Sequence, residues 1–253
     1  MSDLWKRLRF VLGCIIVYRI GTHIPIPGID PVRVSSLFDQ NQGTILELFN
    51  LFSGGALERM SIFALNVVPY ISAAIIMQLF SNAIPYLIEL KKEGQAGRNA
   101  ITQYTRYGTV ALAFVQASAL AVTLSSSGLA YNPGTSFFVT AVFTVVAGTV
   151  FLMWLGEQIS ERGIGNGISI IIATSILTGI PGAIGQALEQ ARQGDLNILM
   201  LLSIGVLAMV VIAIVVFIER GQRRITVNYA QRQQGRRSMQ AQASHLPFKV
   251  NMS

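Results

Sequence analysis

The sequence predicts an all-α membrane protein, a polytopic bundle of helices. Its composition is 52% hydrophobic and only 12% charged, and its mean hydropathy is positive. The apolar residues are gathered in long runs without acidic residues, each near the roughly 20 residues that cross about 30 Å of hydrocarbon. Together these two observations exclude an ordinary soluble domain.

Six apolar segments fit membrane spans in chain order. They cover residues 10–25, 62–80, 107–124, 137–155, 168–184 and 198–218. Lys6, Arg7 and Arg9 before the first segment are also typical of a signal peptide, but no A-x-A-like cleavage site follows. We therefore expect the first segment to be a retained span.

The second span is broken. A short apolar piece from residue 49 carries Gly54-Gly55 and Glu58-Arg59, and the uncharged run from Ile62 contains Pro69. Non-helical backbone at membrane depth is tolerated only where it is buried in protein or lines a water-filled cavity. The segment 49–80 therefore indicates a pathway through the bilayer.

The basic residues predict the orientation of the chain. Most of the 19 lysines and arginines fall at the N-terminus, between spans two and three, between spans four and five, or after residue 219. Only Arg33, Arg59 and Arg192 fall on the opposite side, and Arg19 lies within the first span. The positive-inside rule then places the N-terminus and the C-terminal tail in the cytoplasm.

Topology alone explains the net charge of +7, but the tail holds more arginine than orientation requires. Six arginines lie between residues 219 and 237. Their guanidinium groups suit a polyanion such as ribosomal RNA or an acidic protein face. Anionic lipid headgroups would satisfy the same side chains and stay an alternative.

The sequence offers no catalytic, metal or cofactor site. Cys14 is the only cysteine, and His23 and His245 are far apart in the chain. No Asp or Glu lies inside a span, which disfavours proton relays and intramembrane proteases. The glycine-rich string 163–167 lies between two spans, so a flexible turn is favoured over a nucleotide loop. We expect Arg19, the one charge within a span, to snorkel or pair locally.

Two pairs of aliphatic residues are candidates for a constriction. Val67 and Ile71 are four residues apart after the break, as are Ile168 and Ile172 at the start of the fifth span, so each pair lies on one helical face. Branched aliphatic residues also fill every membrane helix. From spacing alone, ordinary packing is favoured over a pore.

Long strings of the chain resemble the bacterial SecY family of protein-conducting channels. The resemblance runs from Leu4 to Ser253, and it is carried by HIPIPGID from His23, GTILELFNLFSGGALERMSIFAL from Gly43, PYISAAIIMQL from Pro69, ELKKEGQAGR from Glu89, QYTRYGT from Gln103, FLMWLGEQISERGIGNGISIII from Phe151 and ERGQRRITVNYAQRQQGRR from Glu219.

The resemblance implies the first half of an inverted-repeat fold plus the sixth span. The N-terminal half would cover residues 1–184, with a plug at about 48–60; a periplasmic loop and the sixth span would cover 185–218, and a basic cytoplasmic loop 219–253. Val67, Ile71, Ile168 and Ile172 would belong to the pore ring. The plug residues would be Phe49, Phe52, Ser53, Gly54, Gly55, Leu57 and Met60.

The function implied by the resemblance is passage of unfolded secretory proteins across the cytoplasmic (inner) membrane, and of membrane proteins laterally into it. The implied partners are SecE, SecG, the motor ATPase SecA, the ribosome, signal peptides and precursor chains, with anionic lipids around them. Contact with SecA or the ribosome would involve Arg223, Arg224, Arg232, Arg236 and Arg237.

Two departures from the family pattern limit what the resemblance implies. Asn66 and Val67 stand where a glycine and an isoleucine are expected, which predicts a looser ring. The chain also stops before the family's seventh span, so a C-terminal half of the channel would have to be supplied. A non-transporting membrane fragment is the alternative, and a small-molecule transporter would need polar midplane groups that the spans rarely offer.

Overall fold

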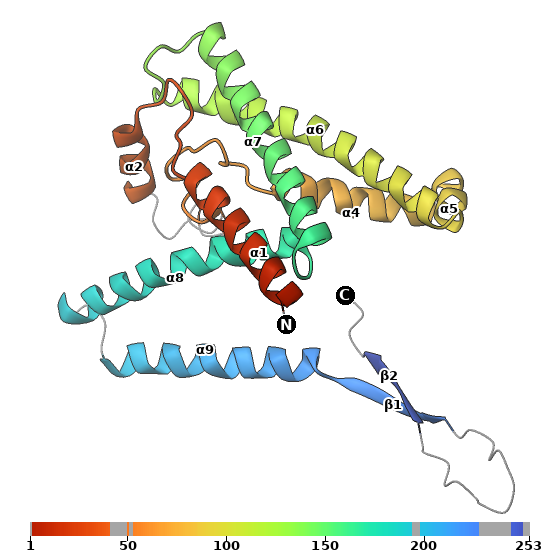
Figure 1. Ribbon diagram of the computed structural model, residues 1–253. Helices are drawn as coiled ribbons and strands as arrows, with labels where there is room; N and C mark the ends of the chain where they lie inside the picture. Colours follow the sequence, from red (N-terminus) through yellow and green to blue (C-terminus); the bar gives the residue numbers. More distant parts are fainter. Residues whose placement is uncertain (1, 41–49, 51–52, 194–197, 228–243, 250–253) are drawn as a thin grey trace, which may run out of the picture. The chain divides into compact units, whose positions relative to one another are not determined.

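The computed structural model describes residues 2–40, 50, 53–193, 198–227 and 244–249 (Figure 1). The chain divides into two compact units, Met1–Ala183 and Ile184–Ser253. Helices make up most of the described structure, so the predicted all-α class is confirmed. A single two-stranded ladder in the second unit is the exception within the described part.

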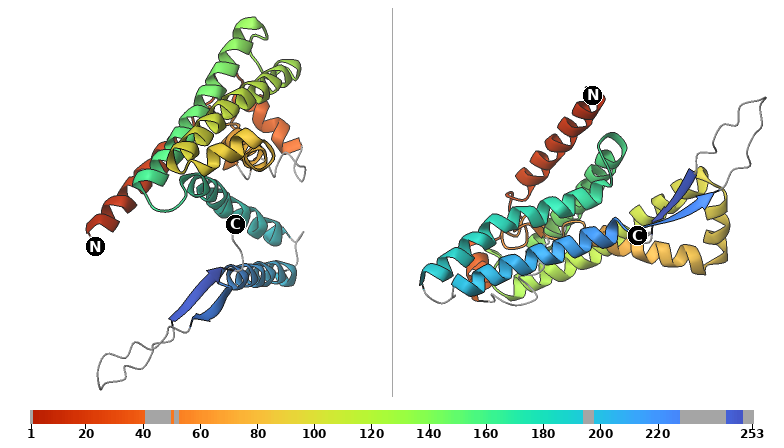
Figure 2. Two further views of the ribbon diagram at one scale, coloured as in Figure 1. Left: turned by 90° about the vertical axis from the view of Figure 1, so that its right-hand side faces the viewer. Right: turned by 90° about the horizontal axis from the view of Figure 1, so that it is seen from below.

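The first unit is a bundle of helices. Helix α6 packs along both α4 and α7, α5 closes the angle between α4 and α6, and α1 packs against α7 (Figure 2). The bounds are α1 Ser2–Gly21, α2 Pro31–Gln40, α4 Val68–Ala83, α5 Pro85–Lys92, α6 Gln95–Ser126, α7 Thr135–Arg162 and α8 Gly167–Gln193, of which the end of α8 belongs to the second unit.

Small side chains bring α6 and α7 together. Ala113, Ala117 and Ala121 recur at every fourth position of α6, and all three are buried. This spacing places them on one face of the helix, where alanine allows close approach of a neighbouring backbone. Ala117 and Ala121 belong to one cluster of buried residues with Val142 and Val145 of α7. The contact between these helices is thus encoded by a repeated small residue.

Within the part of the chain that the structure describes, four helices are long and apolar enough to cross a membrane, namely α6, α7, α8 up to Glu189, and α9 from Leu202. They coincide with the predicted spans 107–124, 137–155, 168–184 and 198–218. Helices α4 and α5 would together form a fifth span, bent by 93°. The predicted first span falls largely on α1, which also carries Lys6, Arg7, Arg9 and Arg19.

The predicted second span, residues 62–80, is not helical over its whole length. Helix α4 begins at Val68, and the residues from Gly54 to Val67 are mostly turns. Asn66 has a φ of 48°, in the left-handed region, and Pro69 occupies the first helical turn, where its missing N–H costs nothing. These two residues set the start of the helix six positions later than hydrophobicity alone suggested.

The second unit holds the end of α8, helix α9 (Ile198–Glu219), and strands β1 (Gln222–Val227) and β2 (Ser244–Lys249). The strands pair antiparallel, from Gln222 opposite Lys249 to Val227 opposite Ser244. The sequence analysis treated 219–253 as a basic loop and did not predict this ladder. The β-branched run Ile225, Thr226, Val227 was the available signal.

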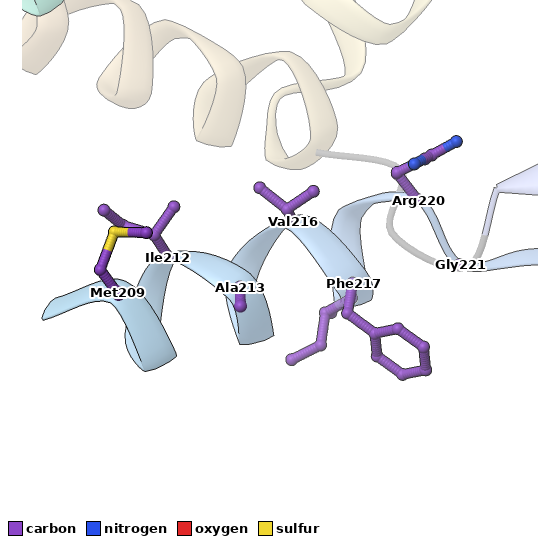
Figure 3. A pocket seen from close by; sticks show the side chains of 8 residues that line it. Met209, Ile212, Ala213, Val216, Phe217, Arg220 and Gly221 are labelled. Atoms are coloured by element: carbon purple, nitrogen blue, oxygen red, sulfur yellow. The ribbon is translucent and has the colours of Figure 1, made fainter. Parts of the chain in front are cut away.

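Helix α9 is apolar on every side. Figure 3 shows Ile212 and Val216 on one side of the helix and Phe217 on another. All three side chains border a groove of about 760 Å³ at the C-terminal end of the helix. The Phe217 side chain is 81% exposed. A helix that is hydrophobic all round is typical of a membrane span surrounded by lipid or by other helices.

Candidate functional site

The four predicted ring residues lie in one apolar cluster of the first unit. Val67 is buried at the N-terminal end of α4, and Ile71 lies one turn further on. Ile168 and Ile172 occupy the first turns of α8 and, like Ile71, are partly buried against the same buried residues. The structure therefore brings together the beginnings of two helices that are distant in sequence.

The α8 residue most deeply buried in this cluster is Ile171, which the sequence analysis did not single out. It is 1% exposed, whereas Ile168 and Ile172 are partly accessible. Since successive helical residues point about 100° apart, Ile171 faces the core while Ile168 and Ile172 border its accessible side. The two predicted ring residues of α8 thus lie at the edge of the cluster.

The described part of the predicted plug packs against the apolar cluster that contains Val67, Ile71, Ile168 and Ile172, which is called the ring cluster below. Ser53, Gly54, Ala56 and Met60 are buried, and Ala56 belongs to the ring cluster itself. Gly55 and Leu57 are half-buried. Phe49 and Phe52, also predicted plug residues, lie outside the described residues. Residues 54–60 of the predicted plug form turns, because Gly54, Gly55 and Met60 all have positive φ.

Helix α1 holds the plug through side-chain hydrogen bonds. The Tyr18 hydroxyl donates to the carbonyl oxygen of Ser53 at 3.3 Å, and Arg19 Nη1 donates to that of Gly54 at 3.1 Å. Arg19 therefore pairs locally, one of the two roles expected for it, and its partner is the plug backbone. The Ser53 carbonyl oxygen also accepts from the N–H of Ala56, at the longer distance of 3.4 Å. In an apolar surrounding the bonds from Tyr18 and Arg19 are stabilising, because a buried carbonyl without a donor costs free energy.

The loop after α1 continues this attachment. The Met60 carbonyl oxygen accepts from the N–H of Ile26 at 2.8 Å, and the Ile24 carbonyl oxygen accepts from that of Ile62 at 2.9 Å. Arg59 Nη1 donates to His23 Nε2 at 2.8 Å. The plug is thus fixed at both of its described ends by residues that lie before it in the chain.

A buried polar network lies between the plug and the ring. The hydroxyls of Tyr18 and Ser175 are 2.5 Å apart, and Asn66 Nδ2 donates to Ser175 Oγ at 3.3 Å. These residues come from α1, from α8 and from the turn before α4. Sequence reasoning missed the network, although a polar side chain inside an apolar span is itself a signal, since it needs a partner.

Asn66 suits this position for a backbone reason as well. The residue adopts a φ of 48°, and asparagine is among the few residues other than glycine that enter the left-handed region readily. The expected glycine would adopt the same conformation but would bring no side chain. Here the turn before the ring gains a hydrogen-bonding group.

The predicted partner-binding arginines lie mostly outside the described residues. This applies to Arg232, Arg236 and Arg237. Arg223 and Arg224 lie on β1, opposite Phe248 and Pro247 in the register, and the Arg223 side chain is exposed. Among the described residues no group of three His, Cys, Asp or Glu side chains could hold a metal ion.

Comparisons with known proteins agree on one family. The SecY family model matches residues 61–253. "Protein translocase subunit SecY" of Pseudomonas aeruginosa is 63% identical over the whole chain, and that of Buchnera aphidicola subsp. Acyrthosiphon kondoi is 59% identical. The chain covers 57% and 72% of these two relatives, so it spans little more than half of the first.

A solved structure supports the fold independently. It is described as the plug domain of the SecY protein stabilizing the closed state of the translocation channel and maintaining a membrane seal. The TM-score is 0.65 at 21% identity, covering 97% of this chain and 52% of that one. With its apolar helices and these relatives, the protein is a multi-pass membrane protein, and the chain belongs to the SecY family.

Proposed function

We propose that this chain forms the N-terminal part of the central subunit of a protein-conducting channel. The channel would pass unfolded secretory proteins across the cytoplasmic membrane and release membrane proteins laterally into it. The observation that supports this most directly is the plug segment, buried against an aliphatic cluster at the N-terminal ends of α4 and α8. The relatives named as translocase subunits point the same way.

Val67, Ile71, Ile168 and Ile172 would provide one side of the pore ring. A narrow apolar constriction disfavours water and ions, because few polar groups replace their hydration, yet it can deform around an extended chain. The second side would come from a C-terminal half. Sealing and passage would then depend on the same side chains.

Opening would be a population shift. A signal peptide that binds beside α4 and partitions towards lipid would favour the state with the plug displaced, in proportion to its preference for that state. The described chain shows no nucleotide-binding loop, so the driving force is assigned to a motor ATPase such as SecA or to the ribosome. SecE and SecG would complete the complex.

The excess of basic residues supports a cytoplasmic N-terminus and a cytoplasmic loop from residue 219 onward. We assign SecA or ribosome contact to this loop, with Arg223, Arg224, Arg232, Arg236 and Arg237 as the contact residues. Anionic lipid headgroups would neutralise arginines that the partner leaves free.

The function is tested with the complete channel in proteoliposomes. This sequence, joined to a SecY C-terminal half and purified with SecE and SecG, should protect a secretory precursor from added protease when SecA and ATP are present. Liposomes that lack this chain are the control. Failure to protect any precursor in active preparations would contradict the proposal.

The docking assignment predicts the effect of reversing Arg236 and Arg237 to glutamate. Each lost charged hydrogen bond is worth about 1.5–3 kcal/mol, so SecA or ribosome binding should weaken more than about tenfold. Binding is measured by co-sedimentation, and membrane insertion of the variant should be unchanged. Reversal of Lys92 and Arg98 is the control, because it changes the charge equally at a different segment. Equal binding by both variants would remove the assignment.

A further inference from the structure

We infer that Tyr18 and Ser175 set how firmly the plug is held, through competition for one hydrogen-bonding proton. The inference rests on the proposed function, since the plug matters only if the chain is part of a channel. Tyr18 is 1% exposed, Ser175 is fully buried, and Ser53 of the plug is 4% exposed. No bulk water reaches these groups in the resting structure.

The hydroxyl groups of Tyr18 and Ser175 have one proton each. The Tyr18 proton can go to the Ser53 carbonyl oxygen of the plug or to the Ser175 hydroxyl of α8. The Ser175 proton can go to the Ile171 carbonyl oxygen at 2.9 Å or to Tyr18. Two arrangements of the same protons are therefore possible.

In one arrangement Tyr18 donates to the plug and Ser175 donates to Tyr18. In the other, Tyr18 donates to Ser175 and Ser175 donates to the Ile171 carbonyl oxygen. The Ser53 carbonyl oxygen then keeps only the longer bond, at 3.4 Å, from the N–H of Ala56. The Tyr18–Ser175 contact is present in both arrangements. The bonds that differ favour the second, because Ser175 Oγ lies 2.9 Å from the Ile171 carbonyl oxygen whereas the Tyr18 hydroxyl lies 3.3 Å from that of Ser53. Ser175 thus takes from the plug part of a bond that Tyr18 could give it.

The plug and Ser175 are also in direct contact. A Cβ atom at Gly54 would lie 3.1 Å from both the Cα and the carbonyl oxygen of Ser175. Displacement of the plug therefore separates it from Tyr18 and Ser175 together. Tyr18 can then keep its proton satisfied on Ser175, which lowers the cost of plug release.

Opposite effects of two small substitutions follow. Tyr18→Phe keeps the aromatic ring but removes the proton, so the plug loses a bond and is released more often. Ser175→Ala removes the competing acceptor, so the Tyr18 proton goes wholly to the plug and release becomes rarer. The Tyr18–Ser175 bond forms whether the plug is in or out, so its own loss cancels between the two states.

The experiment measures plug release in the complete channel with its natural second half. Ala56 is fully buried, so a cysteine placed there in a Cys14→Ala background reports exposure of the plug to N-ethylmaleimide. A net hydrogen bond corresponds to about a fivefold change in population. Tyr18→Phe should raise the labelling rate about fivefold, and Ser175→Ala should lower it.

The double variant Tyr18→Phe/Ser175→Ala should label like Tyr18→Phe alone, because without the Tyr18 hydroxyl the loss of Ser175 frees no proton for the plug. Tyr131→Phe and Ser126→Ala make the same chemical changes at exposed positions and should leave labelling unchanged. Unchanged labelling in Tyr18→Phe, or faster labelling in Ser175→Ala, would overturn the inference. If Tyr18→Phe does not fold, the labelling rate of Ser175→Ala tests the inference alone.

Precursor translocation is measured in the same preparations. A parent channel that shows the expected labelling order but moves no precursor would contradict the proposed function while leaving the contact between Tyr18 and the plug intact. A channel that moves precursor without the expected labelling order would contradict only the inference.

Discussion

At the scale of single residues, the ring position Val67 decides how tightly the channel would seal. Val67 is buried at the start of α4, next to the turn made by Asn66. Valine is one methylene smaller than the isoleucine expected there. A smaller ring side chain leaves more room for water, so the seal is predicted to be looser than one built from isoleucine.

Val67→Ile should reduce ion leak through the resting channel. One buried methylene is worth about 0.8 kcal/mol, which corresponds to a leak about fourfold smaller. The measurement is ion conductance of the complete channel in a planar bilayer. Val139→Ile adds the same methylene at an exposed position of α7 and should leave conductance unchanged. No fall in leak with Val67→Ile would contradict the looser seal.

The candidate site could be predicted from sequence only in part, and the residues show why. Val67 with Ile71 and Ile168 with Ile172 could be paired by helical spacing, and the resemblance suggested joining the two pairs. Tyr18 and Ser175 are 157 positions apart, and no local pattern links them. A contact between residues so far apart in sequence depends on how α1, α8 and the turn before α4 pack together. The spacing of residues within one helix does not predict that packing.

At the scale of elements, the turn segment before α4 is fixed by its fit against α7. A Cβ atom at Gly148 of α7 would lie 2.1 Å from the carbonyl oxygen of Ile62. That carbonyl belongs to backbone held at Ile24, so it has little freedom to move. Glycine at 148 therefore allows irregular backbone to lie flat against a helix.

Gly148→Ala should destabilise the protein by about 1–3 kcal/mol, the usual cost of overpacking a well-filled interior. The measurement is thermal unfolding of the purified protein in detergent. Gly13→Ala is the matched control, because a Cβ atom there meets nothing within 4 Å. Alanine inside a helix is favoured over glycine, so the control should be neutral or slightly stabilising. Equal stability of the two variants would contradict the close fit.

Helices could be predicted wherever a long apolar run continued without interruption. Helices α6, α7, α8 and α9 fall where the hydrophobic runs placed them. The start of α4 was misjudged because Ile62 to Leu65 are apolar without being helical, and backbone conformation at Asn66 overrode hydrophobicity. The β1–β2 ladder was missed because arginine-rich sequence resembles a solvated loop.

At the scale of the whole molecule, the chain holds one side of the proposed pore. It spans 57% of the Pseudomonas aeruginosa relative. Helix α9 is exposed on all sides within its unit, and its side chains would contact lipid or further helices. A membrane seal that needs apolar side chains all round requires a counterpart to the α4–α8 cluster.

The 253-residue chain alone should therefore translocate no precursor when reconstituted with SecE, SecG and SecA. Co-expression with a SecY C-terminal half as a separate polypeptide should restore protease protection, because helices that pack in a bilayer need not be covalently joined. Translocation by the chain alone would contradict the two-sided pore.

The attachment of the plug has a consequence for the order of synthesis. The side chains that hydrogen-bond to it, Tyr18, Arg19 and His23, belong to the first unit, and so does Ser175, which lies beside Gly54. The docking site is therefore complete once the growing polypeptide has reached about Thr178, whose hydroxyl lies beside Gly54. The nascent chain could therefore seat its plug before the second half of the channel is synthesised. The subunit would then have no stage of synthesis without a seated plug.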